Sequence, residues 1–208
     1  MKSTSRPVPS SNQGRFTALL ITALLALAAF AGSAQACSYS GAENVFSPWG
    51  DQRGYVLAPD GGFEAGGSGW QLNHGAAVVQ ENESYYLNDA GDSKSLSLPS
   101  GSSAVSPPVC MEIGTPSFRL VARNSGAPSS QLRVEAVYKL LGLVRTKTAA
   151  TLRAGSTWAP TQSISTVLTL STIVGTLIPS AIEIRFTPLD SSGNWQVDDV
   201  YIDPFRRS

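Results

Sequence analysis

Hydrophobic and polar residues alternate along short segments of this chain from Cys37 onward. In residues 118–123, the apolar side chains point to one side of an extended backbone and the two arginines point to the other. Residues 132–139 and 182–186 alternate in the same way. The pattern predicts three β-strands, each with one buried face.

Further strands are predicted from short runs of β-branched and aromatic residues, at 55–57, 70–72, 76–80, 95–98, 105–111, 143–152, 166–170 and 195–202. Gly, Asn, Asp, Ser and Pro separate these runs. No run of a dozen residues keeps the period of an amphipathic helix, although residues 164–178 leave a weak helix as an alternative. We therefore predict an all-β fold, a two-sheet antiparallel sandwich of the jelly-roll type.

The N-terminus has a different pattern. Lys2, Arg6 and Arg15, with no acidic residue among them, precede an apolar run at 16–31 and the small-residue sequence Ala34-Gln35-Ala36. This order is typical of a helical secretory signal peptide that is cleaved after Ala36. The apolar run is shorter than the roughly 20 residues of a membrane span, and an uncleaved anchor is the alternative. We expect a secreted or cell-envelope protein with no membrane span after cleavage.

The predicted organisation is a signal peptide at 1–36, an N-terminal extension at 37–54, one sandwich domain at 55–205 and a tail at 206–208. The composition, 42% hydrophobic and 14% charged with 19 Gly and 13 Pro, is that of a turn-rich globular protein. Without the leader, twelve Lys and Arg stand against fifteen Asp and Glu. This slightly acidic balance argues against nucleic acid as a partner.

The two cysteines, Cys37 and Cys110, both lie in the part predicted to be exported. In an oxidising compartment, a disulfide between them is the simplest expectation. The alternative is lipidation of Cys37, which would be the first residue after cleavage. Ala34 and Gln35 fit poorly to the sequence that this modification requires.

Two motifs carry a resemblance to a known family. The sequence Gly62-Phe63-Glu64-Ala65-Gly66 precedes Trp70, and Trp195-Gln196-Val197-Asp198-Asp199-Val200 lies near the C-terminus. Together they resemble the two ends of a galactose-binding-like jelly roll, in which the first strand carries G-x-F-E-x-G and a Trp and the last strand reads D-D-V. This group includes carbohydrate-binding modules. The longer string from Phe46 to Phe205 also resembles a set of exported bacterial proteins that carry no functional description.

The resemblance implies a structural Ca²⁺ site with Glu64 and one of Asp198 and Asp199 as carboxylate ligands. Ca²⁺ takes six to eight oxygen ligands, and carbonyls of the Gly-rich turn could supply the others. The alternative is that Glu64 caps a turn and both aspartates are polar edge residues. Strand alternation leaves the choice of aspartate open, because a β-bulge at the pair would bury both sets of neighbouring hydrophobic residues.

Sequence patterns of catalysis are absent. His74 is the only histidine, it lies in a turn, and the chain has no G-x-S-x-G motif, phosphate-binding loop or zinc-ligand set. The densest group of acids lies in a loop rich in Asn, Ser and Gly, which predicts solvation rather than catalysis, and comprises Glu81, Glu83, Asp89 and Asp92. We therefore expect no enzymatic activity.

A sugar-binding surface would need accessible aromatic side chains. The outward positions of the three clearest strands are charged instead, namely Arg119, Arg123, Arg133, Glu135, Lys139, Glu183 and Arg185. Trp70 and Trp195 are predicted to fill the core. The candidate ligand-binding residues are therefore the aromatic residues of loops, Trp49, Tyr85, Tyr86 and Trp158.

The function predicted from these features is that of an exported, non-catalytic β-sandwich module that contacts extracellular or cell-wall carbohydrate through rim loops. The alternative is a structural or protein-interaction domain of the cell envelope that does not bind sugar. The absence of an aromatic strand face favours the alternative, whereas the family resemblance favours the sugar-binding module. A hydrolase is the third and least favoured hypothesis.

Overall fold

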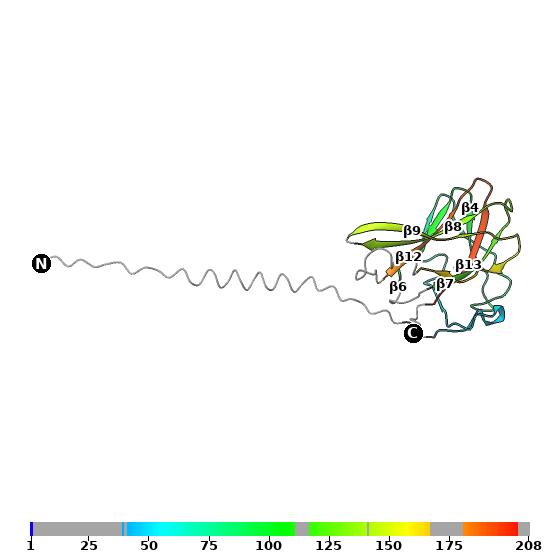
Figure 1. The fold of residues 1–208 in the computed structure, drawn as a ribbon, viewed down its shortest axis with the longest axis horizontal. Coiled ribbons are helices and arrows are strands. Elements are labelled where there is room, and N and C mark those ends of the chain that lie inside the picture. Colours follow the sequence, from blue (N-terminus) through cyan, green and yellow to red (C-terminus); the bar gives the residue numbers. More distant parts are fainter. Residues whose placement is uncertain (2–38, 40, 111–116, 141, 167–180, 204–208) are drawn as a thin grey trace. The chain divides into compact units, whose positions relative to one another are not determined.

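The computed structural model describes residues 1, 39, 41–110, 117–140, 142–166 and 181–203 (Figure 1). Residues 37–208 form one compact unit. The predicted signal peptide and Cys37 lie outside the described residues, as does nearly all of the strand predicted at 166–170. Of the weak helix considered at 164–178, only 164–166 are described, and Ile164–Ser165 is a strand. Within the described ranges, no helix is long and apolar enough to cross a membrane.

Two antiparallel sheets make up the unit (Figure 1). The first sheet has the strand order β10-β7-β13-β4-β3, with β1 beside β13 and β11 beside β7. Its strands are β1 (Val56–Leu57), β3 (Ala77–Val79), β4 (Ser95–Pro99), β7 (Ser117–Asn124), β10 (Ala159–Pro160), β11 (Ile164–Ser165) and β13 (Asn194–Asp203). A single 3-10 turn in the described ranges, η1 (Ser47–Trp49), precedes β1.

The second sheet has the order β2-β5-β12-β8-β9, with β6 beside β12. Its strands are β2 (Gln71–Asn73), β5 (Ser103–Val105), β6 (Val109–Cys110), β8 (Leu132–Leu140), β9 (Leu143–Leu152) and β12 (Ala181–Pro188). The predicted all-β, two-sheet antiparallel sandwich is confirmed. The predicted strand 105–111 is divided into β5 and β6, because Pro107 and Pro108 have no N–H group to donate to a sheet.

The hydrophobic core lies between the sheets and follows the predicted alternation. In β12, every second residue from Ile182 to Pro188 is buried. Facing these residues, the first sheet contributes Leu96, Leu98, Phe118, Leu120, Trp195 and Val197 to the same cluster. Trp70 and Trp195 belong to the core as predicted, and the Trp195 indole N–H donates to Ser130 Oγ at 3.1 Å.

A β-bulge interrupts β13. The pairing of β13 with β7 shifts register between Asp198 and Tyr201, and Asp199 has a left-handed φ of 47°. Before the bulge, Val197 faces the main core; after it, Val200 and Ile202 do. Asp198 and Tyr201 consequently lie on the outer side of the first sheet. The bulge that the sequence left as one possibility is therefore present.

The turn that begins the G-x-F-E motif packs directly against this bulge. Ala58 N–H donates to Val200 O at 2.8 Å, and Val200 N–H donates to Gly61 O at 3.0 Å. A Cβ atom on Gly61 would lie 2.6 Å from Val200 O. Because Val200 O is a backbone atom, it cannot rotate away from a side chain at position 61. Glycine is required at this position by close backbone approach rather than by a positive φ.

Replacing Gly61 by Ala should therefore destabilise the fold by about 1–3 kcal/mol, the usual range for overpacking. Gly155→Ala is the matched control, since no atom lies within 4 Å of a Cβ built there. Chemical denaturation of residues 37–208 measures both variants. Equal midpoints for Gly61→Ala and Gly155→Ala would contradict the close approach.

Candidate functional site

Three of the four predicted ligand-binding aromatic residues meet on the outer side of the first sheet. The Trp49 and Tyr85 rings make an edge-on contact with centroids 5.0 Å apart. The Tyr85 hydroxyl donates to the Trp158 carbonyl at 2.9 Å. Trp49 and Tyr85 are 37% and 41% exposed, so solvent reaches both rings, whereas Trp158 is buried. We call Trp49, Tyr85 and Trp158 the aromatic site.

The fourth predicted residue, Tyr86, is not part of these contacts. Its backbone has a left-handed φ of 54°, and its side chain is exposed. The ring contact of the aromatic site joins Trp49 and Tyr85, and its hydrogen bond joins Tyr85 and Trp158. Tyr86 takes part in neither. Tyr86 therefore lies beside the site in sequence without being linked to it.

Polar side chains adjoin the aromatic site. The Arg123 guanidinium lies 4.9 Å from the centre of the Trp158 ring and forms an ion pair with Glu81. Arg123 Nε donates to Gln196 Oε1 at 2.6 Å, and Gln196 Nε2 donates to Glu81 Oε2 at 2.9 Å. These bonds, first from Gln196 and then from Arg123, hold the pKa of Glu81 below its ordinary value. We call Glu81, Arg123 and Gln196 the polar triad.

The outward arginines of β7 thus do not keep aromatic residues away from this face. Arg119 lies 4.1 Å from the centre of the Phe46 ring, and Arg123 stacks on Trp158. Both aromatic rings reach the face from segments outside β7. A guanidinium attracts the face of an aromatic ring, so an outward Arg can recruit such a ring from a loop.

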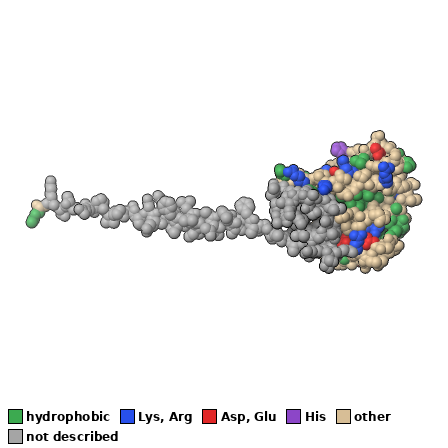
Figure 2. Space-filling view, in the orientation of Figure 1, with side chains coloured by type: hydrophobic (Ala, Val, Ile, Leu, Met, Phe, Trp, Pro, Cys, Tyr) green, Lys and Arg blue, Asp and Glu red, His purple; other side chains and the backbone are tan. Residues whose placement is uncertain are grey.

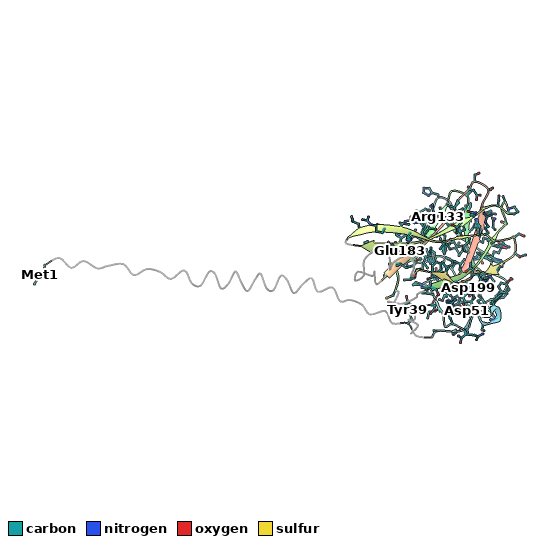
Figure 3. The ribbon with its side chains drawn as sticks, viewed as in Figure 1. Met1, Tyr39, Asp51, Arg133, Glu183 and Asp199 are labelled. Atoms are coloured by element: carbon teal, nitrogen blue, oxygen red, sulfur yellow. The ribbon has the colours of Figure 1, made fainter. Side chains whose placement is uncertain are left out.

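The segment that carries Trp49 is fixed to the first sheet by an ion pair between the buried Arg119 and the partly buried Asp51. Arg119 Nη1 lies 3.0 Å from Asp51 Oδ2, and Arg119 Nε donates to Thr161 O at 2.7 Å. Asp51 also accepts from Tyr55 Oη at 2.8 Å. Phe46, Tyr55 and Tyr201 form a small hydrophobic cluster around this pair. Figure 3 labels Asp51 and Asp199 on the side of the unit opposite Arg133, which belongs to the second sheet.

The loop that carries Tyr85 is held by Glu83, a residue that the sequence pattern assigned to a solvated acidic cluster. That assignment is wrong for Glu83, which is buried. Its carboxylate accepts from the backbone N–H groups of Tyr85 and Leu87, the latter at 2.8 Å. Its own N–H donates to Asp198 Oδ2 at 3.0 Å. A carboxylate that accepts hydrogen bonds from two nearby N–H groups fixes the conformation of its own loop. A pattern of hydrophobic and polar residues does not reveal such bonds.

Asp198 and Asp199 are both buried beneath this loop. Asp198 Oδ1 accepts from the Asp199 N–H at 2.9 Å. Burial, followed by the charge of Asp199, raises the pKa of Asp198 to about 9. Burial, followed by the charges of Glu83 and Asp92, raises the pKa of Asp199 to about 7. Like charges packed together out of water disfavour the ionised forms.

The predicted Ca²⁺ ligands are not assembled into a cluster of carboxylates. Glu64 Oε1 accepts from the N–H groups of Ser93 and Lys94 at 2.8 and 2.7 Å, so it caps that turn. Both Asp198 oxygens accept backbone N–H groups. Among the described residues, no group of three or more His, Cys, Asp or Glu side chains could hold a metal ion.

Of the three predicted Ca²⁺ ligands, Asp199 has a carboxylate oxygen that is free to bind a cation. Its Oδ1 atom is buried without a hydrogen-bond partner. A Cβ on Gly62 would lie 3.3 Å from this oxygen and 3.8 Å from Asp92 Oδ2, so glycine keeps the space between them open. The Ca²⁺ site stays a prediction, and of the two aspartates Asp199 is the one able to serve it.

The single histidine and Cys110 belong to other turns and strands. His74 is exposed in the turn between β2 and β3, as expected of a residue without a catalytic role. Cys37 lies outside the described residues, so its disulfide with Cys110 stays a prediction. Tyr39, two residues later, donates to Cys110 O at 2.8 Å and accepts from Cys110 N–H at 2.9 Å. This contact places Tyr39 beside β6.

Comparisons with known proteins address the fold. No protein-family model matches the sequence, and none of the curated proteins matches it. The CBM22-1 xylan-binding domain of Paenibacillus barcinonensis Xyn10C is 13% identical, covers 74% of this chain and 99% of its own, and has a TM-score of 0.50. This chain shares the β-sandwich fold of that domain.

Two further structures share it. The CBM22-1-GH10 modules of Clostridium thermocellum xylanase 10B, complexed with xylohexaose, are 14% identical over 72% of this chain and 28% of that chain, with a TM-score of 0.51. The enzymatically active domain of bacteriophage CBA120 tailspike protein 4 is 15% identical over 72% and 21%, with a TM-score of 0.50. At such identities the likeness confirms the predicted jelly roll, and function must be argued from the site.

The pairing of Asp51 with Arg53 and Arg119 predicts an acid-sensitive fold. Hydrogen bonds from Arg53 hold the pKa of Asp51 well below its ordinary value. The stabilisation is therefore complete above about pH 5 and is lost as the pH falls. Asp51→Asn should cost about 2–4 kcal/mol at pH 7, because it leaves Arg119 without its counter-charge. In denaturant titrations, the difference between variant and wild type should shrink from about pH 5 to about pH 2; a constant difference would contradict the ion pair.

The unpartnered oxygen of Asp199 predicts the response to Ca²⁺. Excess Ca²⁺ should raise the unfolding midpoint of residues 37–208 above that measured with chelator, and Asp199→Asn should remove the increase. Glu64→Ala tests whether Glu64 is also a ligand, since loss of its cap alone lowers both midpoints equally. A wild-type midpoint that is the same with Ca²⁺ and with chelator would exclude the site.

Proposed function

We propose that this protein is a non-catalytic binding module that contacts carbohydrate through the aromatic site and the polar triad. The observation that carries the proposal is the junction of two solvent-accessible rings, Trp49 and Tyr85, with hydrogen-bonding side chains on one face. A sugar ring offers C–H groups on its faces and hydroxyl groups at its edges. Aromatic rings with a few fixed polar groups beside them complement both.

The rigidity of this surface supports the proposal. The carboxylate of Glu83 fixes the Tyr85 backbone, the Arg119–Asp51 pair fixes the segment of Trp49, and β10 pairs with β7 directly after Trp158. A surface that is ordered before binding loses little entropy when a ligand is bound.

The state of the acids supports a role without catalysis. Glycoside hydrolysis requires two carboxyl groups that are free to donate a proton or attack a sugar carbon. Glu81 is engaged by Arg123 and Gln196. Both Glu83 oxygens accept backbone N–H groups. Neither side chain near the aromatic rings is therefore available as an acid or nucleophile.

Export is part of the proposal. The leader at residues 1–36 has the order of a signal peptide. Tyr39 lies against Cys110, which supports a disulfide from Cys37 to the same strand. A module that binds extracellular or cell-wall glycan would be placed by such a leader where its ligand is, and a disulfide would persist there.

Glycan binding by residues 37–208 tests the proposal. A panel that includes xylohexaose, other neutral β-linked oligosaccharides and cell-wall glycan should give at least one ligand by calorimetry. Tyr85→Ala should weaken that affinity about tenfold or more, because it removes one ring and the contact that positions Trp49. Tyr86→Ala is the matched control and should bind within about twofold of wild type.

Two results would count against this function. A panel without any ligand would favour the envelope structural or protein-interaction domain. A ligand whose affinity Tyr85→Ala and Trp49→Ala leave unchanged would place the site elsewhere. Circular dichroism of both variants excludes unfolding as the cause of any loss.

A further inference from the structure

The end of the β8–β9 hairpin lies beyond the part of the second sheet that other described strands support. The last pairing of β12 with β8 joins Glu183 and Val137. The hairpin continues to the pair of Leu140 and Leu143, and Gly142, with a φ of 77°, lies in the turn. Figure 1 shows β9 extending away from the two sheets. We call the described residues of 138–145 the hairpin end.

Aliphatic side chains are exposed there. Leu143 is 55% exposed and Val144 is 59% exposed. The other large hydrophobic residues exposed in the described part of the unit are the aromatic residues at or beside the proposed glycan surface and a single Leu189. Adjacent exposed aliphatic residues next to a turn are costly in water and indicate a contact surface.

Cationic residues flank this apolar end. Lys139 lies opposite Val144 in the register, and Arg145 follows it; both are exposed. Residues 136–147 contain Lys139, Arg145 and Lys147 and no acidic residue. Figure 2 shows hydrophobic atoms next to Lys and Arg atoms at the corresponding end of the unit. Glu183 of β12 lines the same hollow as Lys139 and Val144, so three cationic residues stand against one acidic residue at this end of the unit.

We propose that the hairpin end inserts into the surface of an anionic lipid bilayer. Leu143 and Val144 would enter the boundary between head groups and acyl chains, and Lys139 and Arg145 would meet lipid phosphates. Polar residues follow at once along β9, from Arg145 to Thr148, so the apolar surface is confined to the turn. The short apolar end matches the boundary of the acyl chains, and the cationic residues beside it match the layer of lipid phosphates.

The shape of the surface favours a bilayer over a protein partner. A stable protein interface buries about 800 Å² on each side. The hairpin end is a two-stranded ribbon bordered by charged and Thr side chains, and the hollow beside it, which Lys139, Val144 and Ile182 line, has a volume of only about 320 Å³. A bilayer is fluid and accepts individual side chains without shape complementarity. This inference is independent of the proposed glycan site, which lies on the first sheet.

Vesicle sedimentation with residues 37–208, the part that contains the whole described core, tests the inference. The protein should bind vesicles of phosphatidylcholine that contain one third phosphatidylglycerol and should bind pure phosphatidylcholine far more weakly. Binding should fall as salt rises. Lys139→Gln and Arg145→Gln should each weaken binding about fivefold.

The decisive variant is Leu143→Asp with Val144→Asp, which should reduce vesicle binding more than about tenfold. Leu189→Asp is the matched control, because Leu189 is a 44% exposed aliphatic residue after β12 and should not affect binding. Hydrogen exchange of residues 138–146 should slow when anionic vesicles are added to the wild type. Thermal unfolding confirms that the variants are folded.

Three results would overturn the inference. The first is the absence of binding to anionic vesicles. The second is binding that the double variant retains, which would assign the lipid contact to another surface. The third is self-association in sedimentation velocity that the double variant abolishes while lipid has no effect; a second copy of the chain would then be the occupant.

Discussion

The β-bulge in β13 is the constraint on which the arrangement of this protein depends. A regular strand would send every second side chain to one face, yet β13 must serve two hydrophobic clusters on opposite sides of the same sheet. The extra residue at Asp199 allows Val197, Val200 and Ile202 to enter the main core while Tyr201 packs outward against Phe46 and Tyr55. The outer cluster then anchors the segment that carries Trp49.

The same bulge explains why acidic residues are buried beneath the Tyr85 loop. Asp198 points outward from the sheet and accepts from the Glu83 N–H, so a hydrogen bond attaches the loop to the strand in addition to the packing of Leu87 against the outer cluster. Such an attachment is directional, because it needs particular atoms at particular distances. Hydrogen bonds to the backbone therefore help to set the position of Tyr85. The candidate surface does not depend on aromatic packing alone.

The local pattern of the sequence was sufficient for the fold class, most strands and the core tryptophans, because alternation and turn residues are properties of neighbouring positions. It was also sufficient to propose Trp49, Tyr85 and Trp158. It could not show that these three meet or that Tyr86 stands apart, since their contacts depend on the pairing of β7 with β10 and on Glu83. Arg123 and Gln196 resemble ordinary outward strand residues, and only the sheet register brings them to Glu81.

The contact of Tyr39 with β6 has a consequence for the solution behaviour of the protein. β6 is short, and its Cys110 is aligned with Ala181 of β12 on one side. The Tyr39 hydroxyl occupies both the N–H and the carbonyl of Cys110, as a residue of a neighbouring strand would. One phenol thus closes a sheet edge to strand addition by another molecule. Tyr39 thereby covers the outer backbone groups of Cys110, which in other sandwiches are protected by lysines, prolines or bulges.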